Sequence, residues 1–220
     1  EYLIRQEWME GFATALHQHP YTFFSLEKPP IRTPKDMIGK QIGIQATGKI
    51  LLTALLKKQN IPEKDVEVVV VGADFSPLLT GQVDACTGWL TSTTAIKALG
   101  QPPVTLRLGD AGVQLYALPW YAHTKTIASQ PKVLEAFLRA TARGWHHAKA
   151  NRDQAAELLV KEYPNLKRED ERVALDAMLE YALGAVPAVA DAGAVPRVET
   201  KTGRLKLVFT RDGAASDATL

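Results

Sequence analysis

The feature that most constrains this chain is a regular alternation of strand-like and helix-like segments between residues 41 and 108. Short apolar segments alternate with segments of helical spacing, an order that favours βαβ units and a parallel sheet covered by helices. Strands are expected at residues 41–44, 66–71, 83–87 and 104–108, and helices at residues 49–59, 76–79 and 93–99. Residues 66–71 contain five valines, which is typical of a central strand buried on both faces. The segment therefore predicts a doubly wound α/β lobe.

Composition excludes several classes of protein. The chain has 220 residues, of which 46% are hydrophobic and 23% charged, and this suits one large domain or two small lobes. Its 26 Lys and Arg are interspersed with 24 Asp and Glu, so a nucleic-acid partner is not expected. A single cysteine, Cys86, cannot form an internal disulfide. No apolar run approaches the roughly 18 residues that span a bilayer.

The flanking segments differ in character. Residues 1–20 place Leu3, Ile4, Trp8, Phe12 and Leu16 at helical spacing and predict an amphipathic helix that ends at Pro20. Residues 21–26 predict a short strand, and the three prolines of residues 28–34 predict extended chain. After residue 129 the pattern is helical: one helix begins near Pro131, a second is capped by Asn151, with Gln154 in capping-box position, and a third covers residues 168–182. Beyond Gly184 we expect a weakly ordered tail with a hairpin at residues 201–203.

One short motif suggests phosphate binding but is incomplete. Residues 43–50, GIQATGKI, follow a predicted strand, precede a predicted helix and nearly match the P-loop pattern. Ile50 has no hydroxyl to bind Mg²⁺, so a P-loop NTPase stays only an alternative. Thr47 and Gly48 still lie at a helix N-terminus, where N–H groups favour an anion, although a plain helix cap explains them equally well.

Other polar residues give a weaker signal. Thr47, Asp74 and Trp89 each follow a predicted strand, and ligands of open α/β sheets lie outside the carboxyl ends of the strands. Trp89 can instead be a core residue. Cys86 lies inside an apolar strand and is interpreted as a structural thiol. Neither the pair His17 and His19 nor the pair His146 and His147 has the spacing of metal ligands, so no metal site is expected.

Three segments together resemble a known family. They are PKDMIGKQIG at residues 34–43, FSPLLTGQVDA at residues 75–85, and LEAFLRATARGW at residues 134–145 followed by NRDQA at residues 151–155. In this order and spacing they resemble the solute-binding components of ABC importers in the NMT1/THI5-like group, which serve taurine, aliphatic sulfonates, nitrate and thiamine pyrimidines. The resemblance extends from about residue 21 to residue 182.

The resemblance implies a type II periplasmic-binding-protein fold of class α/β, with one complete doubly wound lobe and the helices of an incomplete second one. Residues 1–33 would be a partial first lobe and crossover, residues 34–111 the complete lobe, residues 112–183 the second crossover and the returning helices, and residues 184–220 the tail. Compared with that family, we expect this chain to lack much of the first lobe, since only some 20 residues precede the first crossover. By position, the residues that would face the interlobe cleft are Thr47, Gly48, Asp74, Phe75, Thr87, Trp89 and Tyr116.

The function implied is non-catalytic binding, without cofactor or metal, of a small nitrogen- or sulfur-containing solute: a sulfonate or taurine, nitrate, or a thiamine-pyrimidine precursor. The implied partners are the solute and an ABC permease, and the implied location is the periplasm, with the signal peptide outside this chain. Self-association is expected because apolar helix faces with Leu134, Phe137 and Trp145 lack the strands that would cover them. A THI5-like pyrimidine synthase is an alternative, but its cysteine-rich iron motif is not matched by the lone Cys86.

Overall fold

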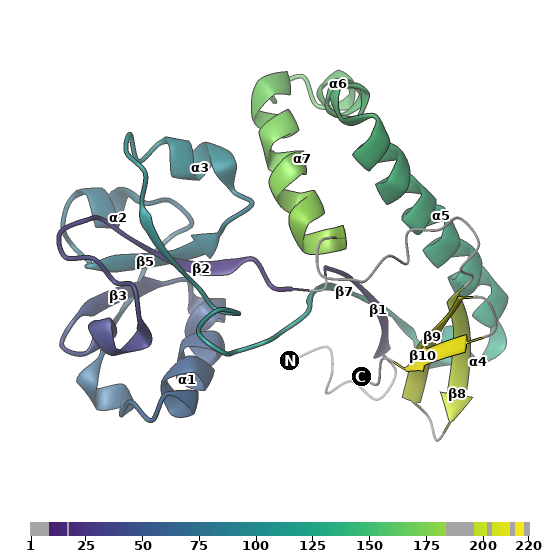
Figure 1. The fold of residues 1–220 in the computed structure, drawn as a ribbon, viewed down its shortest axis with the longest axis horizontal. Coiled ribbons are helices and arrows are strands. Elements are labelled where there is room, and N and C mark those ends of the chain that lie inside the picture. The colour runs from purple at the N-terminus through teal and green to yellow at the C-terminus, as the bar shows by residue number, and fades with distance from the viewer. Residues whose placement is uncertain (1–8, 17, 184–195, 202–203, 212–213, 218–220) are drawn as a thin grey trace.

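The alternating segments between residues 41 and 108 form one of two lobes in the computed structural model of the chain (Figure 1), which describes residues 9–16, 18–183, 196–201, 204–211 and 214–217. We call it the five-stranded lobe. Its strands are β2 (Tyr21–Ser25), β3 (Gln41–Ile44), β4 (Glu67–Val70), β5 (Ala85–Trp89) and β6 (Val104–Arg107). Its helices are α1 (Lys49–Lys58), α2 (Ser76–Leu79) and α3 (Thr93–Lys97), with the 3-10 helices η1 (Pro34–Met37), η2 (Ala46–Gly48) and η3 (Glu63–Asp65).

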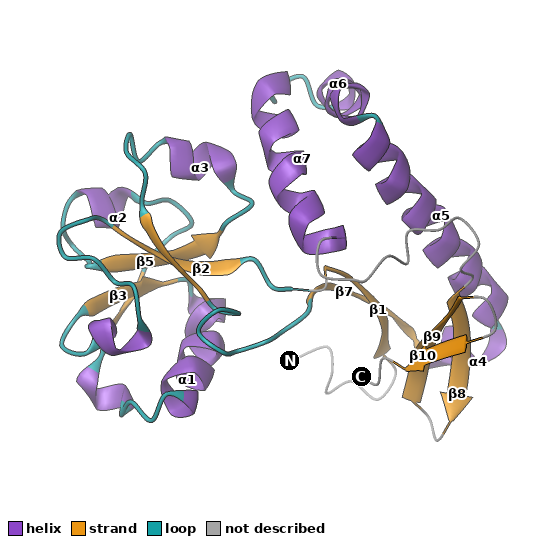
Figure 2. Cartoon of the chain, in the orientation of Figure 1, coloured by secondary structure: helices purple, strands orange, loops and turns teal. Residues whose placement is uncertain are grey.

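The other lobe is mainly helical (Figure 2), and we call it the helical lobe. It contains the antiparallel pair β1 (Met9–Leu16) and β7 (Ala117–His123), followed by α4 (Thr124–Ser129), α5 (Pro131–Ala150), α6 (Arg152–Glu162) and α7 (Arg168–Leu183). A separate three-stranded antiparallel sheet consists of β8 (Pro196–Lys201), β9 (Arg204–Arg211) and β10 (Ala214–Asp217). No helix in these described ranges is both long and apolar enough to cross a membrane.

The sheet of the five-stranded lobe has the order β4-β3-β5-β2-β6. Strand β3 is parallel to β4 and β5, whereas β2 is antiparallel to both of its neighbours. Every residue of β2 is buried. Because side chains alternate between the faces of a strand, β2 sends Phe23 into the core beneath α1 and Phe24 into the core beneath α2 and α3.

The valine-rich strand is not central, as the sequence predicted, but forms the edge of the sheet. Val68 is 40% exposed and Val70 is 70% exposed. A run of β-branched residues favours a strand, but it does not specify the position of that strand in the sheet. The order of strands is set by long-range pairing, and here the internal strands are β3, β5 and β2.

The predicted helix over residues 1–20 is also wrong where the structure describes it. Residues 9–16 form β1, which pairs with a strand more than 100 residues away in the sequence. The register shifts between Gly11 and Ala13, so the adjacent Phe12 and Ala13 are both buried, as is Leu16. A bulge of this kind breaks the period-2 pattern and left an apolar spacing that resembled a helix. Residues 1–8 and 17 lie outside the described residues.

Other expectations agree more closely with the structure. The three long helices begin at Pro131, after Asn151 and at Arg168, as predicted. The Asn151 side chain donates to the His147 carbonyl and does not form the predicted capping box with Gln154.

The five-stranded lobe begins before residue 34, which was the expected boundary, because β2 belongs to its sheet. Strands β8 and β9 form the predicted hairpin, while residues 184–195 lie outside the described residues and the expected weak order of the tail stays a prediction.

We predict that the five-stranded lobe depends on its centre and not on its valine-rich edge. Phe24→Ala removes a fully buried ring and should lower the free energy of unfolding by about 3–5 kcal/mol. Val70→Ala, the control in the same sheet, should change it by less than about 0.5 kcal/mol because the side chain is largely exposed. Urea unfolding followed by circular dichroism measures both, and equal losses would contradict this assignment of the core.

Candidate functional site

Polar groups gather at one edge of the five-stranded sheet, where β3 and β5 end and β2 begins. Strand β3 leads through η2 into α1, and β5 ends at Trp89. Because β2 runs antiparallel to β5, its first residue, Tyr21, pairs with Trp89. This is the carboxyl edge of the parallel strands, the position at which open α/β sheets bind ligands.

Two buried hydroxyl groups lie at this edge. Tyr21 is 5% exposed and Thr87 is 2% exposed. Tyr21 lies two residues before Phe23, and Thr87 pairs with Phe23, so both side chains belong to the sheet face that α1 covers. Neither the Tyr21 Oη nor the Thr87 Oγ1 makes a hydrogen bond of normal geometry within the described part of the chain. Buried hydroxyls normally have a partner, so this pair points to a polar ligand.

The Tyr21 phenol is a donor at neutral pH. Burial raises its pKa above the ordinary value, and the neighbouring Thr87 hydroxyl offsets only part of that rise. The phenol proton remains available to an acceptor placed beside it.

The phenol is directed at the beginning of α1. A Cβ atom added to Gly48 would lie 2.2 Å from the Tyr21 Oη and 3.1 Å from the Tyr21 Cζ. Gly48 itself has ordinary right-handed helical angles, so the close approach of Tyr21, not the backbone conformation, requires a glycine here. No side chain among the described residues caps α1. The 3-10 helix η2 leads directly into α1, and the Gly48 N–H already donates to the Gln45 carbonyl at 2.7 Å. This end therefore offers the positive end of the helix dipole and the N–H groups that precede Gly48.

An aromatic cluster completes this edge. The rings of His19 and Trp89 lie 5.4 Å apart and those of His19 and Tyr21 lie 5.9 Å apart, both edge to face. The backbone N–H of Tyr21 donates to the His19 Nδ1 at 3.2 Å, so the neutral ring carries its proton on Nε2. Burial lowers the pKa of His19, which favours this neutral form.

The structure divides the predicted site residues between the two faces of the sheet. Thr47, Gly48, Thr87 and Trp89 belong to the edge described above, with Thr47 exposed and Trp89 half-buried. Asp74 and Phe75 follow β4, which is parallel to β3 and ends at the same edge. Asp74 is exposed and accepts the Ser76 N–H at 2.9 Å, whereas Phe75 is buried against Phe24 on the other face of the sheet. Tyr116 is 48% exposed just before β7.

His19 and Tyr21 were missed by sequence reasoning. The sequence predicts Tyr21 only as the start of a short strand and places His19 inside the helix predicted for residues 1–20. The only signal was the run HPYTFF, residues 19–24, in which aromatic and polar groups follow a proline. Nothing in that run indicates that the strand inserts into the centre of a sheet formed by later residues.

The thiol of Cys86 is a weak candidate for a nucleophile. Burial raises the pKa of the Cys86 thiol to about 11, partly offset by a hydrogen bond from the Leu78 backbone. A thiol of that pKa is a poor nucleophile near neutral pH. Within the described ranges, no three His, Cys, Asp or Glu residues are arranged to hold a metal ion.

Comparison with known proteins identifies the family. The model of the family described as NMT1/THI5 like matches residues 5–155. The chain belongs to this family. No curated protein sequence matches it.

Solved structures similar to this NMT1/THI5-like chain include sulfonate-binding proteins and an enzyme. The periplasmic aliphatic sulphonate binding protein SsuA from Escherichia coli has a TM-score of 0.59 at 17% identity, over 77% of this chain and 59% of that one. The alkanesulfonate-binding protein SsuA from Xanthomonas axonopodis pv. citri, bound to MOPS, has a TM-score of 0.54 at 16% identity, with the same coverage. DszB, in complex with biphenyl-2-sulfinic acid, has a TM-score of 0.51 at 17% identity, over 83% of this chain and 66% of that one.

These similarities establish the fold. The NMT1/THI5-like chain has the α/β fold of type II periplasmic binding proteins, and it spans about 59% of the length of the two SsuA proteins. Sequence identities of 16–17% do not transfer residue roles from one protein to another. The candidate site residues of this chain therefore depend on the geometry of its own sheet edge.

We predict that Gly48 and Tyr21 are coupled. Gly48→Ala should lower the free energy of unfolding by about 1–3 kcal/mol, because the new methyl group overlaps the buried phenol. In a Tyr21→Phe background the same change should cost clearly less, since the nearest atom of the ring then lies at 3.1 Å. A double-mutant cycle in urea measures the coupling. Additive effects would show that the two residues are not in contact.

The lowered pKa of His19 predicts a pH dependence. The unfolded chain binds a proton near pH 6.5 whereas the folded chain does so at lower pH, so stability is complete above pH 6.5 and falls as the pH drops through the folded pKa. His19→Gln should flatten this acid-side loss. His146→Gln, at an exposed position of α5, is the control and should retain it. Urea unfolding midpoints at several pH values between 7 and 5 measure the effect. An equal acid-side loss of stability in the two variants would contradict the role of His19.

Proposed function

We propose that this protein is the solute-binding component of an ABC importer and that it binds a small anionic or strongly polar solute at the edge formed by Tyr21, Thr87 and the start of α1. The observation that carries the proposal is the pair of buried hydroxyls without hydrogen bonds to the described residues, of which the Tyr21 hydroxyl lies against Gly48 at the start of α1. A solute oxygen at this position would accept from both hydroxyls and from N–H groups of the first helical turn.

The chemistry of the edge favours a sulfonate among the solutes considered. Helix N-termini and hydroxyl donors suit an anion with several acceptor oxygens. The acidic side chain that follows a strand at this edge, Asp74, is exposed and accepts the Ser76 N–H. Trp89, half-buried beside His19, offers an apolar face to the carbon part of the solute. The two SsuA proteins with this fold are described as binding aliphatic sulphonates or alkanesulfonates, which agrees with this preference.

We propose a binding role without catalysis. DszB shows that the fold also supports an enzyme, and the family description includes THI5. In this chain the Cys86 thiol is buried, with its pKa raised to about 11, which does not suit a nucleophile. The proposed location is the periplasm and the proposed macromolecular partner is an ABC permease.

The proposal predicts solute binding that depends on the two hydroxyls. Calorimetry with taurine, an alkanesulfonate, nitrate and an aminopyrimidine should give its strongest signal with a sulfonate. Tyr21→Phe and Thr87→Val should each weaken that binding by roughly ten-fold or more, in line with about 1.5–3 kcal/mol for a hydrogen bond to a charged group. Without solute, Tyr21→Phe should leave the unfolding midpoint unchanged or slightly raised, since it removes an unpartnered hydroxyl.

The matched control is Tyr163→Phe, which removes the same atom from a residue that is 58% exposed at the end of α6. It should bind as the unmodified protein does. If Tyr21→Phe, Thr87→Val and Tyr163→Phe bind a sulfonate with equal affinity, the binding site lies elsewhere. If the aminopyrimidine binds most strongly, it replaces the sulfonate as the proposed solute.

A further inference from the structure

Helix α7 lies between the two lobes. It follows α5 and α6 in the helical lobe but extends back toward the five-stranded lobe (Figures 1 and 2). It packs against α6 and β1 in its own lobe and against α3 in the other one. Helix α7 therefore contacts both lobes, in addition to the two chain segments that cross between them.

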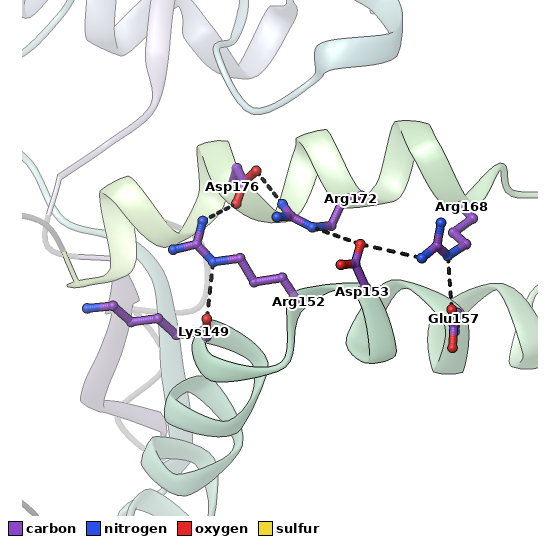
Figure 3. Close-up of polar contacts among 7 residues, drawn as sticks. All are labelled: Lys149, Arg152, Asp153, Glu157, Arg168, Arg172 and Asp176. Carbon is purple, nitrogen blue, oxygen red and sulfur yellow. Dashed lines mark hydrogen bonds and ion pairs between the residues drawn. The ribbon is translucent and has the colours of Figure 1, made fainter.

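A network of charged side chains fixes α7 to α6 (Figure 3). Arg152 donates to Asp176 at 2.6 Å, and Arg172 lies 3.3 Å from Asp153. Arg168 pairs with both Asp153 and Glu157. Burial acts to raise the pKa of Asp176, but hydrogen bonds from Arg172 and Arg152 outweigh it and hold that pKa below its usual value. The network connects α7 to α6 at several points along the two helices.

Two further ion pairs connect α7 to the five-stranded lobe. The Lys97 Nζ at the end of α3 lies 3.4 Å from the Asp170 Oδ1. The Arg107 Nη1 at the end of β6 lies 3.7 Å from the Glu180 Oε1. Asp170 and Glu180 are ten residues apart, about 15 Å along the helix axis, so the two contacts are well separated and resist rotation of one lobe against the other.

The C-terminal end of α7 adds an apolar contact at the same boundary. Tyr181 and Ala182 are buried with Leu16 of β1 and Ala117 of β7. Trp89 and Leu90, from the end of β5 in the five-stranded lobe, pack against this cluster. Trp89 therefore belongs both to the proposed solute site and to the contact that α7 makes between the lobes.

We propose that α7 is an interlobe strap whose ion pairs with Lys97 and Arg107 hold the lobes in the arrangement of this structure. Exposed ion pairs are weak and are screened by salt. The strap is therefore adjustable: changing the charge at Lys97 or raising the salt concentration shifts the lobes toward a more open arrangement. Trp89 packs against the cluster at the C-terminal end of α7. The proposed solute site and the strap therefore share the boundary between the two lobes.

The experiment measures the distance between the lobes directly, with spin labels at Lys64→Cys in the five-stranded lobe and Arg143→Cys in α5, both exposed positions, while Cys86 is buried. Pulsed electron resonance without solute gives the populations of short and long distances. Lys97→Glu should raise the ratio of long to short distances roughly two- to five-fold, the range expected for an exposed pair. Adding Asp170→Lys to Lys97→Glu restores an ion pair and should return the ratio toward that of the unmodified protein.

The control breaks an exposed ion pair inside one lobe. Arg32 and Glu27 lie 2.8 Å apart in the five-stranded lobe, and Arg32→Glu should leave the distances unchanged. High salt should raise the ratio in the unmodified protein and change it less in Lys97→Glu, in which only the pair of Arg107 and Glu180 remains. Unchanged distances in Lys97→Glu, or a failure of the exchanged pair to restore them, would overturn the proposal. Since no solute is present, this result is independent of the proposed solute binding.

Discussion

The insertion of β2 between β5 and β6 is the contact on which the rest of the structure depends. This strand arrives from the helical lobe, runs antiparallel to its neighbours and is buried along its whole length. Its side chains supply both cores of the five-stranded lobe, since Phe23 packs under α1 and Phe24 packs under α2 and α3. A strand that satisfies two ladders of hydrogen bonds and two cores joins the lobes more firmly than a surface linker can.

The same insertion creates the candidate site. Because β2 is antiparallel, its first residue lies at the edge where the parallel strands end, and Tyr21 meets Trp89 and Gly48 there. The Tyr21 ring contributes to the core while its hydroxyl remains without a normal hydrogen bond beside Thr87. A single side chain thus connects the stability of the lobe with the proposed recognition of a polar solute.

The two lobes are held by contacts of different strength. The crossover segments and the apolar cluster of Leu16, Ala117 and Tyr181 remove nonpolar surface from water. The ion pairs of Lys97 and Arg107 with α7 are partly exposed and individually weak. This combination suits a protein that changes the arrangement of its lobes around a hinge without losing either core.

The amino-acid sequence by itself determined the local structure of this protein: the alternation of helices and strands from residue 41 onward, the starts of α5, α6 and α7, and the family motifs. These features depend on spacing, caps and prolines within a few residues. Tertiary structure alone decided the edge position of β4, the strand formed by residues 9–16 and the central position of β2, because hydrogen bonds to distant segments select them. The same reason explains the site: Thr47, Gly48, Thr87 and Trp89 could be found from strand ends, whereas Tyr21 and His19 join them only through antiparallel pairing that no local pattern encodes.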